Sequence, residues 1–427
     1  MLSLKPQPKK TTPSSTLRTR GRRRFSAWQL VGASVVLGIL VLGGVAFALG
    51  GAISHAAWMD NDGGKHMHQN NIVSTIGGLN KISMVGSTEN IIDANGKTVK
   101  VDANPYDVTA APVSSGNLKA GDLIVNNWGA MGEGTTLVKF AGQKGTGHLF
   151  NISQTNIVDG PGQIAFSPMN DRLWVANSGK ANDVVILTAN GKNLATIKSP
   201  LFNHPWGMAT NSGTWANMDY WSHDYYDAYM HHNVKIAFFT SNLNDGKILR
   251  IDVVPQNNGG PQFKVSQIGQ LGVNANKAPT FIPLWWVPQL KAGGRMWQDV
   301  LLTGDPARNA ITAFPNSTDS NYWNRHMGWR KGMVLFTGKP LNTPGGLALN
   351  PINGDLLVVN LADNNLLELN LTLHQVIATK QIDPMAVDAK GNGAALFGVL
   401  AVKDQWGNLK VFFTDDNTNS LNALSVS

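Results

Sequence analysis

Six short apolar runs of this chain end on Asn or Asp, and the side-chain oxygens of these residues are the clearest candidates for chemistry. The six residues are Asn127, Asn177, Asn242, Asp305, Asn360 and Asp416. Amide and carboxylate oxygens are the ligands that hard divalent cations prefer. We therefore predict that these residues, with Glu133 in a Gly-rich loop, can form a site for Ca²⁺ or another divalent cation. The alternative is that each side chain only braces its own turn by accepting nearby backbone N–H groups.

The elements that must position these side chains form a repeat. The apolar runs recur at spacings of 50 to 65 residues, at Leu123–Asn127, Leu173–Asn177, Phe238–Asn242, Leu301–Asp305, Leu356–Asn360 and Phe412–Asp416. A loop and an alternating strand follow each run, at Leu137–Phe140, Val184–Leu187, Ile248–Ile251, Ala310–Phe314, Leu366–Leu369 and Ser420–Leu424. Self-similarity at this period, with several strands per unit, indicates a β-propeller. We predict an all-β fold, a six-bladed β-propeller with four strands in each blade.

A second recurring element, a Pro or Gly turn before a small apolar strand, precedes most of the runs. It occurs at Pro161–Ala165, Pro205–Ala209 and Pro344–Ala348, more loosely at Pro105–Val108 and Gly398–Ala401, and without a clean copy at the bulkier Pro279–Val287 of the fourth unit. In a propeller these turns and the Asn or Asp turns emerge on the same face, around one mouth of the central channel. We expect Tyr106, His204 and Trp206, which lie at these turns, to bind a ligand there.

This pairing of elements resembles the NHL-repeat and SMP-30/gluconolactonase-like six-bladed propellers over roughly Asn104 to Ser427. The resemblance implies the fold, and it also implies lactone hydrolysis with a metal held by one Glu, two Asn and one Asp at the channel mouth. Of the chain's three Glu residues, Glu133 is the one placed to reach that mouth, and the family's catalytic Asp-Gly turn is echoed only by Asn244–Lys247. The sequence assigns no catalytic residue.

Two functions of different class remain open, because such propellers host enzymes and binding platforms alike. The first is a non-catalytic binding or interaction scaffold. The second is a metal-dependent, lactonase-like hydrolase with its site at the channel mouth.

The last unit ends after its third strand, so the ring lacks one outer strand. We predict that a segment within Asn71–Asp102 supplies this strand. Closure of the ring in this way would leave no free sheet edge.

The N-terminal segment indicates the location of the protein in the cell. Residues 1–25 contain eight basic residues and no acidic residue. Of the 35 Lys and Arg residues, 27 therefore lie in the rest of the chain, where they balance the 27 Asp and Glu residues. This neutral body predicts no nucleic-acid partner. The uncharged segment Ala27–Ile53 is long enough to span a bilayer. We expect a basic cytoplasmic tail over residues 1–25, a transmembrane anchor or signal segment over 26–56, a linker over 57–70 and the propeller over 71–427. The positive-inside rule places the propeller in the periplasm or outside the cell.

The alternative to a membrane anchor is a cleaved signal peptide, with export after cleavage near residue 56.

The absence of cysteine excludes thiolate metal sites and cysteine nucleophiles.

Two aromatic insertions, residues 214–233 and 316–332, interrupt the third and fourth units. The order of the strands predicts both on the face opposite the Asn and Asp turns. Exposed aromatic clusters are typical of surfaces that bind proteins or carbohydrates. The alternative is an internal minicore that caps the blades.

Overall fold

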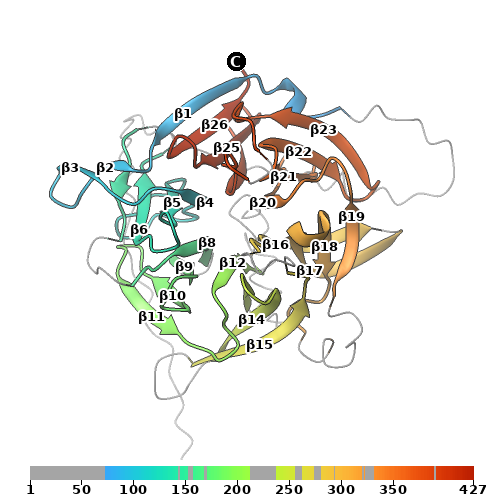
Figure 1. Ribbon diagram of the computed structural model, residues 1–427, viewed down its shortest axis with the longest axis horizontal. Helices are drawn as coiled ribbons and strands as arrows, with labels where there is room; N and C mark the ends of the chain where they lie inside the picture. Colours follow the sequence, from blue (N-terminus) through green and yellow to red (C-terminus); the bar gives the residue numbers. More distant parts are fainter. Residues whose placement is uncertain are drawn as a thin grey trace, which may run out of the picture. The chain divides into compact units, whose positions relative to one another are not determined.

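The computed structural model describes residues 73–142, 145–151, 157–167, 171–211, 237–254, 262–273, 280–292, 294–319, 322, 331–388 and 391–427. These residues form six sheets around a central axis (Figure 1). The predicted all-β, six-bladed propeller is therefore confirmed. The tail and the segment 26–56 lie outside the described residues. Within the described part of the chain, no helix is long and apolar enough to cross a membrane.

Each blade is built outward from an inner strand. The inner strands of blades 1 to 6 are β4 (Pro105–Ala110), β8 (Pro161–Ser167), β12 (Pro205–Thr210), β16 (Leu284–Ala292), β20 (Pro344–Leu349) and β24 (Val399–Lys403). The second strands are β5 (Leu123–Asn127), β9 (Arg172–Asn177), β13 (Ala237–Asn242), β17 (Arg295–Asp305), β21 (Leu356–Asn360) and β25 (Leu409–Asp415). The third strands are β6 (Thr136–Phe140), β10 (Asp183–Leu187), β14 (Lys247–Val254), β18 (Ala310–Phe314), β22 (Asn365–Asn370) and β26 (Ser420–Ser425). The outer strands are β7 (His148–Leu149), β11 (Asn193–Ile197), β15 (Gln262–Gln270), β19 (Met333–Thr337), β23 (Gln375–Gln381) and, for blade 6, β1 (Lys81–Ser87).

Two details of the predicted blades are wrong. Blade 1 has six strands in the order β3-β2-β7-β6-β5-β4, because the hairpin of β2 (Asn90–Ile92) and β3 (Thr98–Lys100) pairs with β7. In blade 6 the second strand ends at Asp415 and not at Asp416. Asp415 faces Ser420 across the ladder as Asn360 faces Asn365 in blade 5, so Asp415 holds the position predicted for its neighbour.

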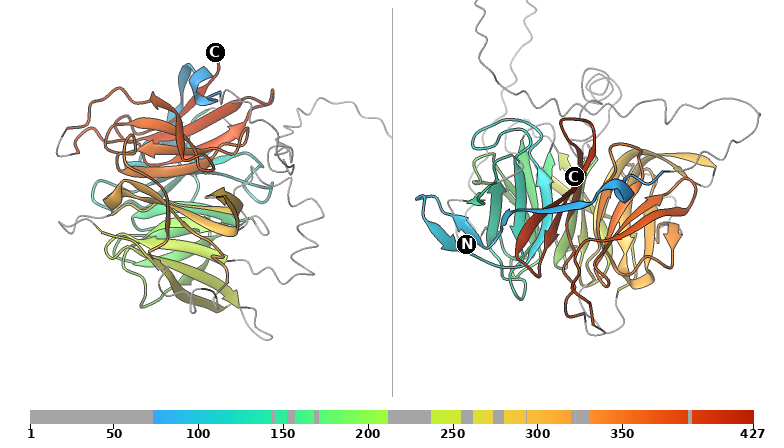
Figure 2. Two further views of the ribbon diagram at one scale, coloured as in Figure 1. Left: turned by 90° about the vertical axis from the view of Figure 1, so that its right-hand side faces the viewer. Right: turned by 90° about the horizontal axis from the view of Figure 1, so that it is seen from above.

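The ring is closed by the N-terminal part of the body, as predicted. Strand β1 runs antiparallel along the outer side of β26, from Lys81 opposite Ser425 to Ser87 opposite Ser420 (Figures 1 and 2). Ahead of β1, a short 3₁₀ turn, η2 (Ile76–Gly78), packs between blades 5 and 6 with Ile76 and Leu79 buried. We call residues 74–87 the closing strap. The first and last strands of the described body therefore lie in one sheet.

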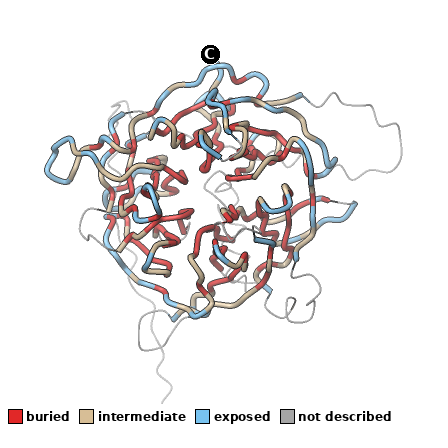
Figure 3. The backbone as a smooth tube through the Cα atoms, viewed as in Figure 1, coloured by how far each residue is buried: buried red, intermediate tan, exposed pale blue. Residues whose placement is uncertain are grey.

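The core consists of one apolar layer between each pair of neighbouring blades. The side chains of blades 4 and 5, for example, share a cluster around Val300, Leu302, Val358 and Leu367. Both faces of an inner sheet are therefore buried, which is why β8 is buried throughout while the outer strand β11 is largely exposed. Figure 3 shows the same gradient from buried inner strands to exposed outer strands.

The two faces of the ring differ in their connections. The turn face carries the turns between second and third strands, at 127–136, 177–183, 242–247, 305–310, 360–365 and 415–420. The opposite face, which we call the cavity face, carries the turns between first and second strands, such as 403–409 in blade 6.

Candidate functional site

Four of the predicted site residues on the turn face direct their amides into their own blades. Each amide nitrogen donates to a backbone carbonyl of the segment leading into its blade at 2.7 to 2.9 Å: Asn127 to Thr88, Asn177 to Ile157, Asn242 to Leu201 and Asn360 to Pro340. Each also donates to a side chain in the turn or at the start of the third strand: Thr136, Asp183, Asp245 and Asp363, respectively. The amides thus hold the turns through their nitrogen atoms, whereas the turn-bracing interpretation expected the side-chain oxygens to accept backbone N–H groups of the same turn.

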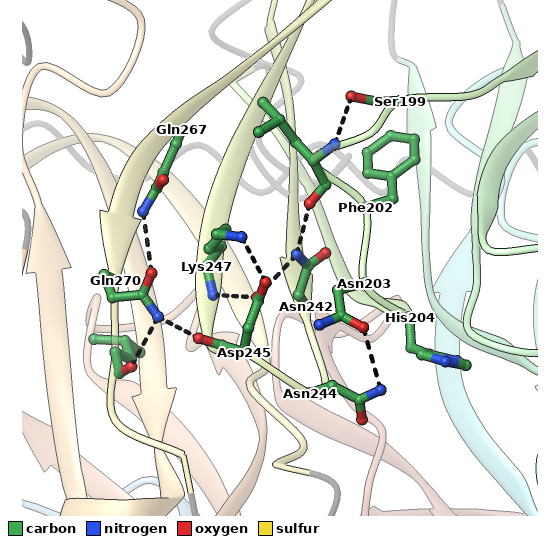
Figure 4. Close-up of polar contacts among 12 residues, drawn as sticks. Ser199, Phe202, Asn203, His204, Asn242, Asn244, Asp245, Lys247, Gln267 and Gln270 are labelled. Atoms are coloured by element: carbon green, nitrogen blue, oxygen red, sulfur yellow. Dashed lines mark hydrogen bonds and ion pairs between the residues drawn. The ribbon is translucent and has the colours of Figure 1, made fainter.

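The turn of blade 3 shows this arrangement in full (Figure 4). Asn242 Nδ2 lies 2.9 Å from the Leu201 carbonyl oxygen and 3.0 Å from Asp245 Oδ1. Lys247 Nζ lies 2.7 Å from Asp245 Oδ2. Burial would raise the pKa of Asp245, but the hydrogen bonds from Lys247 and Asn242 outweigh it and hold the pKa below its usual value. The one Asp-Gly turn that echoes the lactonase pattern thus presents an ionised, fully engaged carboxylate.

The remaining predicted metal ligands are placed differently from one another. Asp305 binds Arg308 through Oδ2, and burial raises the Asp305 pKa although Arg308 opposes this. Burial and the neighbouring Asp415 raise the pKa of Asp416 to about 6. Glu133 is exposed and accepts the Met131 N–H of its own loop at 2.6 Å.

Four oxygens of this predicted set are buried and, among the described residues, have no hydrogen-bond partner. They are Oδ1 of Asn127, Asn242, Asp305 and Asp416. Over the same described ranges, no three His, Asp or Glu side chains cluster closely enough to hold a metal ion. The metal site of the sequence analysis therefore stays a prediction.

A second set of Asn residues, which was not predicted from the sequence, links neighbouring blades. Asn182, Asn309, Asn364 and Asn419 lie in the same turns with φ between 46° and 55°. Their side-chain oxygens accept backbone N–H groups of the next blade's leading segment, from His204, Thr343, Ala395 and Asn104, at 2.7 to 3.1 Å. Three of them follow Asp305, Asn360 and Asp415 by four residues, and this spacing is the signal that could have revealed them.

The predicted ligand-binding residues Tyr106 and Trp206 meet on the axis, in an aromatic plug formed with Trp128, Phe281 and Phe397. The ring centroids of Tyr106 lie 5.1 Å from Trp206 and 3.8 Å from Phe397, and those of Trp206 and Phe281 are 4.7 Å apart. Trp206 is only 1% exposed. The plug therefore fills the channel at the turn face.

His204 lies beside the plug rather than in it. Its Nδ1 is 2.5 Å from the Ser178 carbonyl oxygen, and its backbone N–H donates to Asn182. Its φ of 58° places it in the left-handed region immediately before Pro205. These contacts make His204 part of the link between blades 2 and 3.

The channel forms a cavity between the plug and the cavity face. Inner-strand residues line it, including Asp107 of β4, Gln163 and Phe166 of β8, Met208 of β12 and Trp285 of β16. Its volume is about 40 Å³, room for about three water molecules at roughly 10–15 Å³ each. The predicted site lies at the other end of the channel, on the turn face, and a residue pattern does not reveal which end the side chains fill.

The inner strands have no further strand on the side of the axis, so their N–H groups on that side need other hydrogen-bond acceptors. Polar side chains around the cavity provide these acceptors. Asp107 Oδ2 accepts the Ile164 N–H at 2.9 Å. Gln163 Oε1 accepts the N–H groups of Met208 at 3.2 Å and Leu284 at 2.7 Å. Asp107 is buried so completely that its pKa rises to about 7, although the N–H groups of Ile164 and Val108 oppose the shift.

The first predicted aromatic insertion, residues 214–233, lies outside the described residues, and residues 316–319, 322 and 331–332 of the second are described. The described strands that flank them, β12 with β13 and β18 with β19, end or begin on the cavity face, so the chain leaves and re-enters the blades where predicted. Tyr322 is described and packs against the core cluster between blades 3 and 4, as a minicore residue would.

Comparison with known proteins does not assign this chain to a family. No family model matches the sequence, and no curated protein is similar to it. Among solved structures, the chain is similar to a Bacteroides thetaiotaomicron protein of unknown function, with 11% identity, a TM-score of 0.48, and coverage of 81% of this chain and 76% of that one. It is also similar to an auxiliary nutrient binding protein of the same organism, with 11% identity, a TM-score of 0.47 and coverage of 80% and 75%. The Pan2 WD40 domain of Neurospora crassa gives 12% identity, a TM-score of 0.42 and coverage of 81% and 96%.

Proposed function

We propose that this protein is a non-catalytic binding scaffold that is anchored in a membrane by residues 26–56 and recognises its ligand or partner at the cavity face. The observation that carries this proposal is the contrast between the two ends of the channel. At the turn face, aromatic rings fill the axis and the Asn amides are engaged in their own blades. At the cavity face, polar and aromatic side chains border a cavity.

Exposed apolar side chains on the cavity face support the same assignment. Trp406, at the tip of the hairpin between β24 and β25, is 75% exposed. Met296, close to the tip of the hairpin between β16 and β17, is 44% exposed. Both hairpins join first and second strands, so both project from the cavity face. An exposed tryptophan such as Trp406 is a common anchor in binding surfaces.

The second candidate, a metal-dependent, lactonase-like hydrolase, is favoured by one observation. The four unpartnered oxygens of the turn face come from four different blades, and an unpartnered buried acceptor needs a water molecule or a cation. The scaffold is the better supported function because the described acids of this face do not cluster and Glu133 binds its own loop.

A thermal melt separates the two functions. A resident cation would stabilise the native state by about 2.7 kcal/mol at a hundredfold excess over its dissociation constant. The scaffold predicts no shift in melting temperature with millimolar Ca²⁺, Mg²⁺, Mn²⁺ or Zn²⁺ and no lactone hydrolysis. A shift that disappears in Asp305→Ala, together with hydrolysis, would contradict the scaffold.

The proposed anchoring rests on the uncharged length of Ala27–Ile53 and the basic residues before it. The full-length chain should stay with membranes through carbonate extraction and keep its own N-terminus. A soluble exported protein that begins near residue 57 would show cleavage instead.

A further inference from the structure

Asp107 is the only ionisable side chain among the described residues that line the channel cavity. It is 6% exposed, and none of the described Lys, Arg or His side chains contributes to its pKa. Burying a carboxylate without a cation is costly, so such a group is expected to be paired. The cavity therefore contains a carboxyl group that lacks the cationic partner its ionised form requires.

The backbone contacts of the inner strands do not explain a carboxyl group at this position. The same kind of N–H on an inner strand is satisfied by a neutral group in the next blade. Gln163 Oε1 accepts the N–H groups of Met208 and Leu284. An amide at position 107 would serve Ile164 equally well. The charge of Asp107 is therefore available for a different purpose.

The rest of the cavity suits a small cation. Phe166, Trp285 and Trp286 contribute aromatic side chains to its lining, and aromatic faces attract cations. The lining residues contributed by β8, β12, β16, β20 and β24 are all neutral, so none competes for Asp107.

From this arrangement we infer that the cavity binds the ammonium group of a primary amine, with Asp107 as its counter-ion. The inference rests on the proposed function, because it names the ligand chemistry of the cavity face. A volume of about 40 Å³ admits a group of about three water volumes, which fits an ammonium head with one or two carbons and excludes a sugar ring. The remainder of a longer amine would extend through the mouth.

The test is calorimetric titration of the full-length protein with ethylammonium chloride, and with ethanol as the neutral control. We expect ethylammonium but not ethanol to bind. Because the pKa of the free Asp107 carboxyl lies near 7, the affinity should fall about tenfold from pH 8 to pH 6. At pH 6, binding should release close to one proton, measured in buffers of different ionisation enthalpy.

Two substitutions identify the counter-ion. Asp107→Asn keeps an acceptor for Ile164 and should abolish binding, whereas Asp93→Asn, at an exposed hairpin of blade 1, removes the same charge and should leave binding unchanged. Nα-acetyl-lysine methylamide, used as a third probe, distinguishes the source. If it binds more tightly than ethylammonium, the ligand is a lysine side chain of a partner protein rather than a free amine.

The inference fails if ethylammonium binds equally well to wild type and Asp107→Asn, or if the affinity does not change between pH 6 and pH 8. It also fails if wild type shows no binding at tens of millimolar amine. In that last case, crosslinking of a partner from Trp406 on the cavity face would show that the proposed function stands without this ligand.

Discussion

The closing strap should depend on one buried carboxylate, Glu368 of β22. Glu368 is 0% exposed and accepts hydrogen bonds from Ser74 Oγ at 2.7 Å, the Thr75 N–H at 3.0 Å and the Ile76 N–H at 3.2 Å. Asn350 and Asn353 donate to the same carboxylate at 3.3 and 3.0 Å. The side chain therefore joins the strap to blade 5, next to the point where β1 completes blade 6. We predict that Glu368→Ala destabilises the whole ring and not only the strap.

The magnitude follows from the number of donors left behind. A hydrogen bond to a charged group contributes about 1.5–3 kcal/mol, and a buried donor left unsatisfied costs about 1–3 kcal/mol. These contributions do not add, since the donors share one acceptor and some regain water, so we expect a total loss of about 3–5 kcal/mol. Glu368→Gln keeps the shape but turns an NH₂ group toward donors, and it should cost about 1–3 kcal/mol.

The assay is urea unfolding followed by tryptophan fluorescence, with limited proteolysis of the strap as a second readout. Glu89→Ala is the matched control, because Glu89 makes a surface ion pair with Lys100, which is 71% exposed, and such pairs contribute at most about 1 kcal/mol. If Glu368→Ala loses no more stability than Glu89→Ala, and residues 74–87 remain equally protected, the role assigned to Glu368 is refuted.

Three further predictions concern the channel and the links between blades. In the folded protein the pKa of Asp107 is about 7, above its ordinary value of 3.8, so wild type loses stability as the pH rises from about 4 to 7. The stability advantage of Asp107→Asn should therefore grow by about 1.4 kcal/mol per pH unit from pH 5 to 7 in urea melts and then level off. A constant difference would contradict the burial of this carboxyl group. Trp206→Ala should cost about 3–5 kcal/mol by removing the centre of the plug, and a loss under about 1 kcal/mol would show that the plug is not packed. Asn364→Gly keeps the positive φ but removes the side-chain acceptor of the Ala395 N–H, and it should cost about 1–3 kcal/mol of stability. The control Asp171→Gly, at another positive φ, should change stability by only a few tenths of a kcal/mol. Equal effects would contradict the role of Asn364 in linking blades 5 and 6.

The fold was predictable because local and global patterns agree. Runs such as Leu123–Asn127 and Leu356–Asn360 coincide with β5 and β21, and the missing outer strand of blade 6 pointed to the strand found at Lys81–Ser87. Strand periodicity and turn chemistry act over a few residues, so a single sequence contains them. The choice between Asp415 and Asp416 was not predictable in the same way, because a shift of one residue changes the facing partner without changing the pattern.

The site was less predictable because it depends on residues from many blades. Tyr106 and Trp206 were predicted as ligand-binding residues at the channel mouth, and only the packing of Phe281 and Phe397 against them shows that they close the channel. Asp107 lies in a short strand that resembles any other inner strand, and its burial results from closure of the whole ring. The pKa and the function of such a residue are properties of the tertiary structure and not of its sequence neighbours.

The most direct test of the account is to ask which face of the propeller meets another molecule. A photo-crosslinking amino acid would replace Trp406 on the cavity face or, as the matched control, Met131 on the turn face, since these side chains are 75% and 87% exposed. Both full-length variants would be irradiated in the cells that produce the protein. We expect a discrete crosslinked species from position 406 that is absent from position 131. A species from position 131 alone would contradict the proposed function.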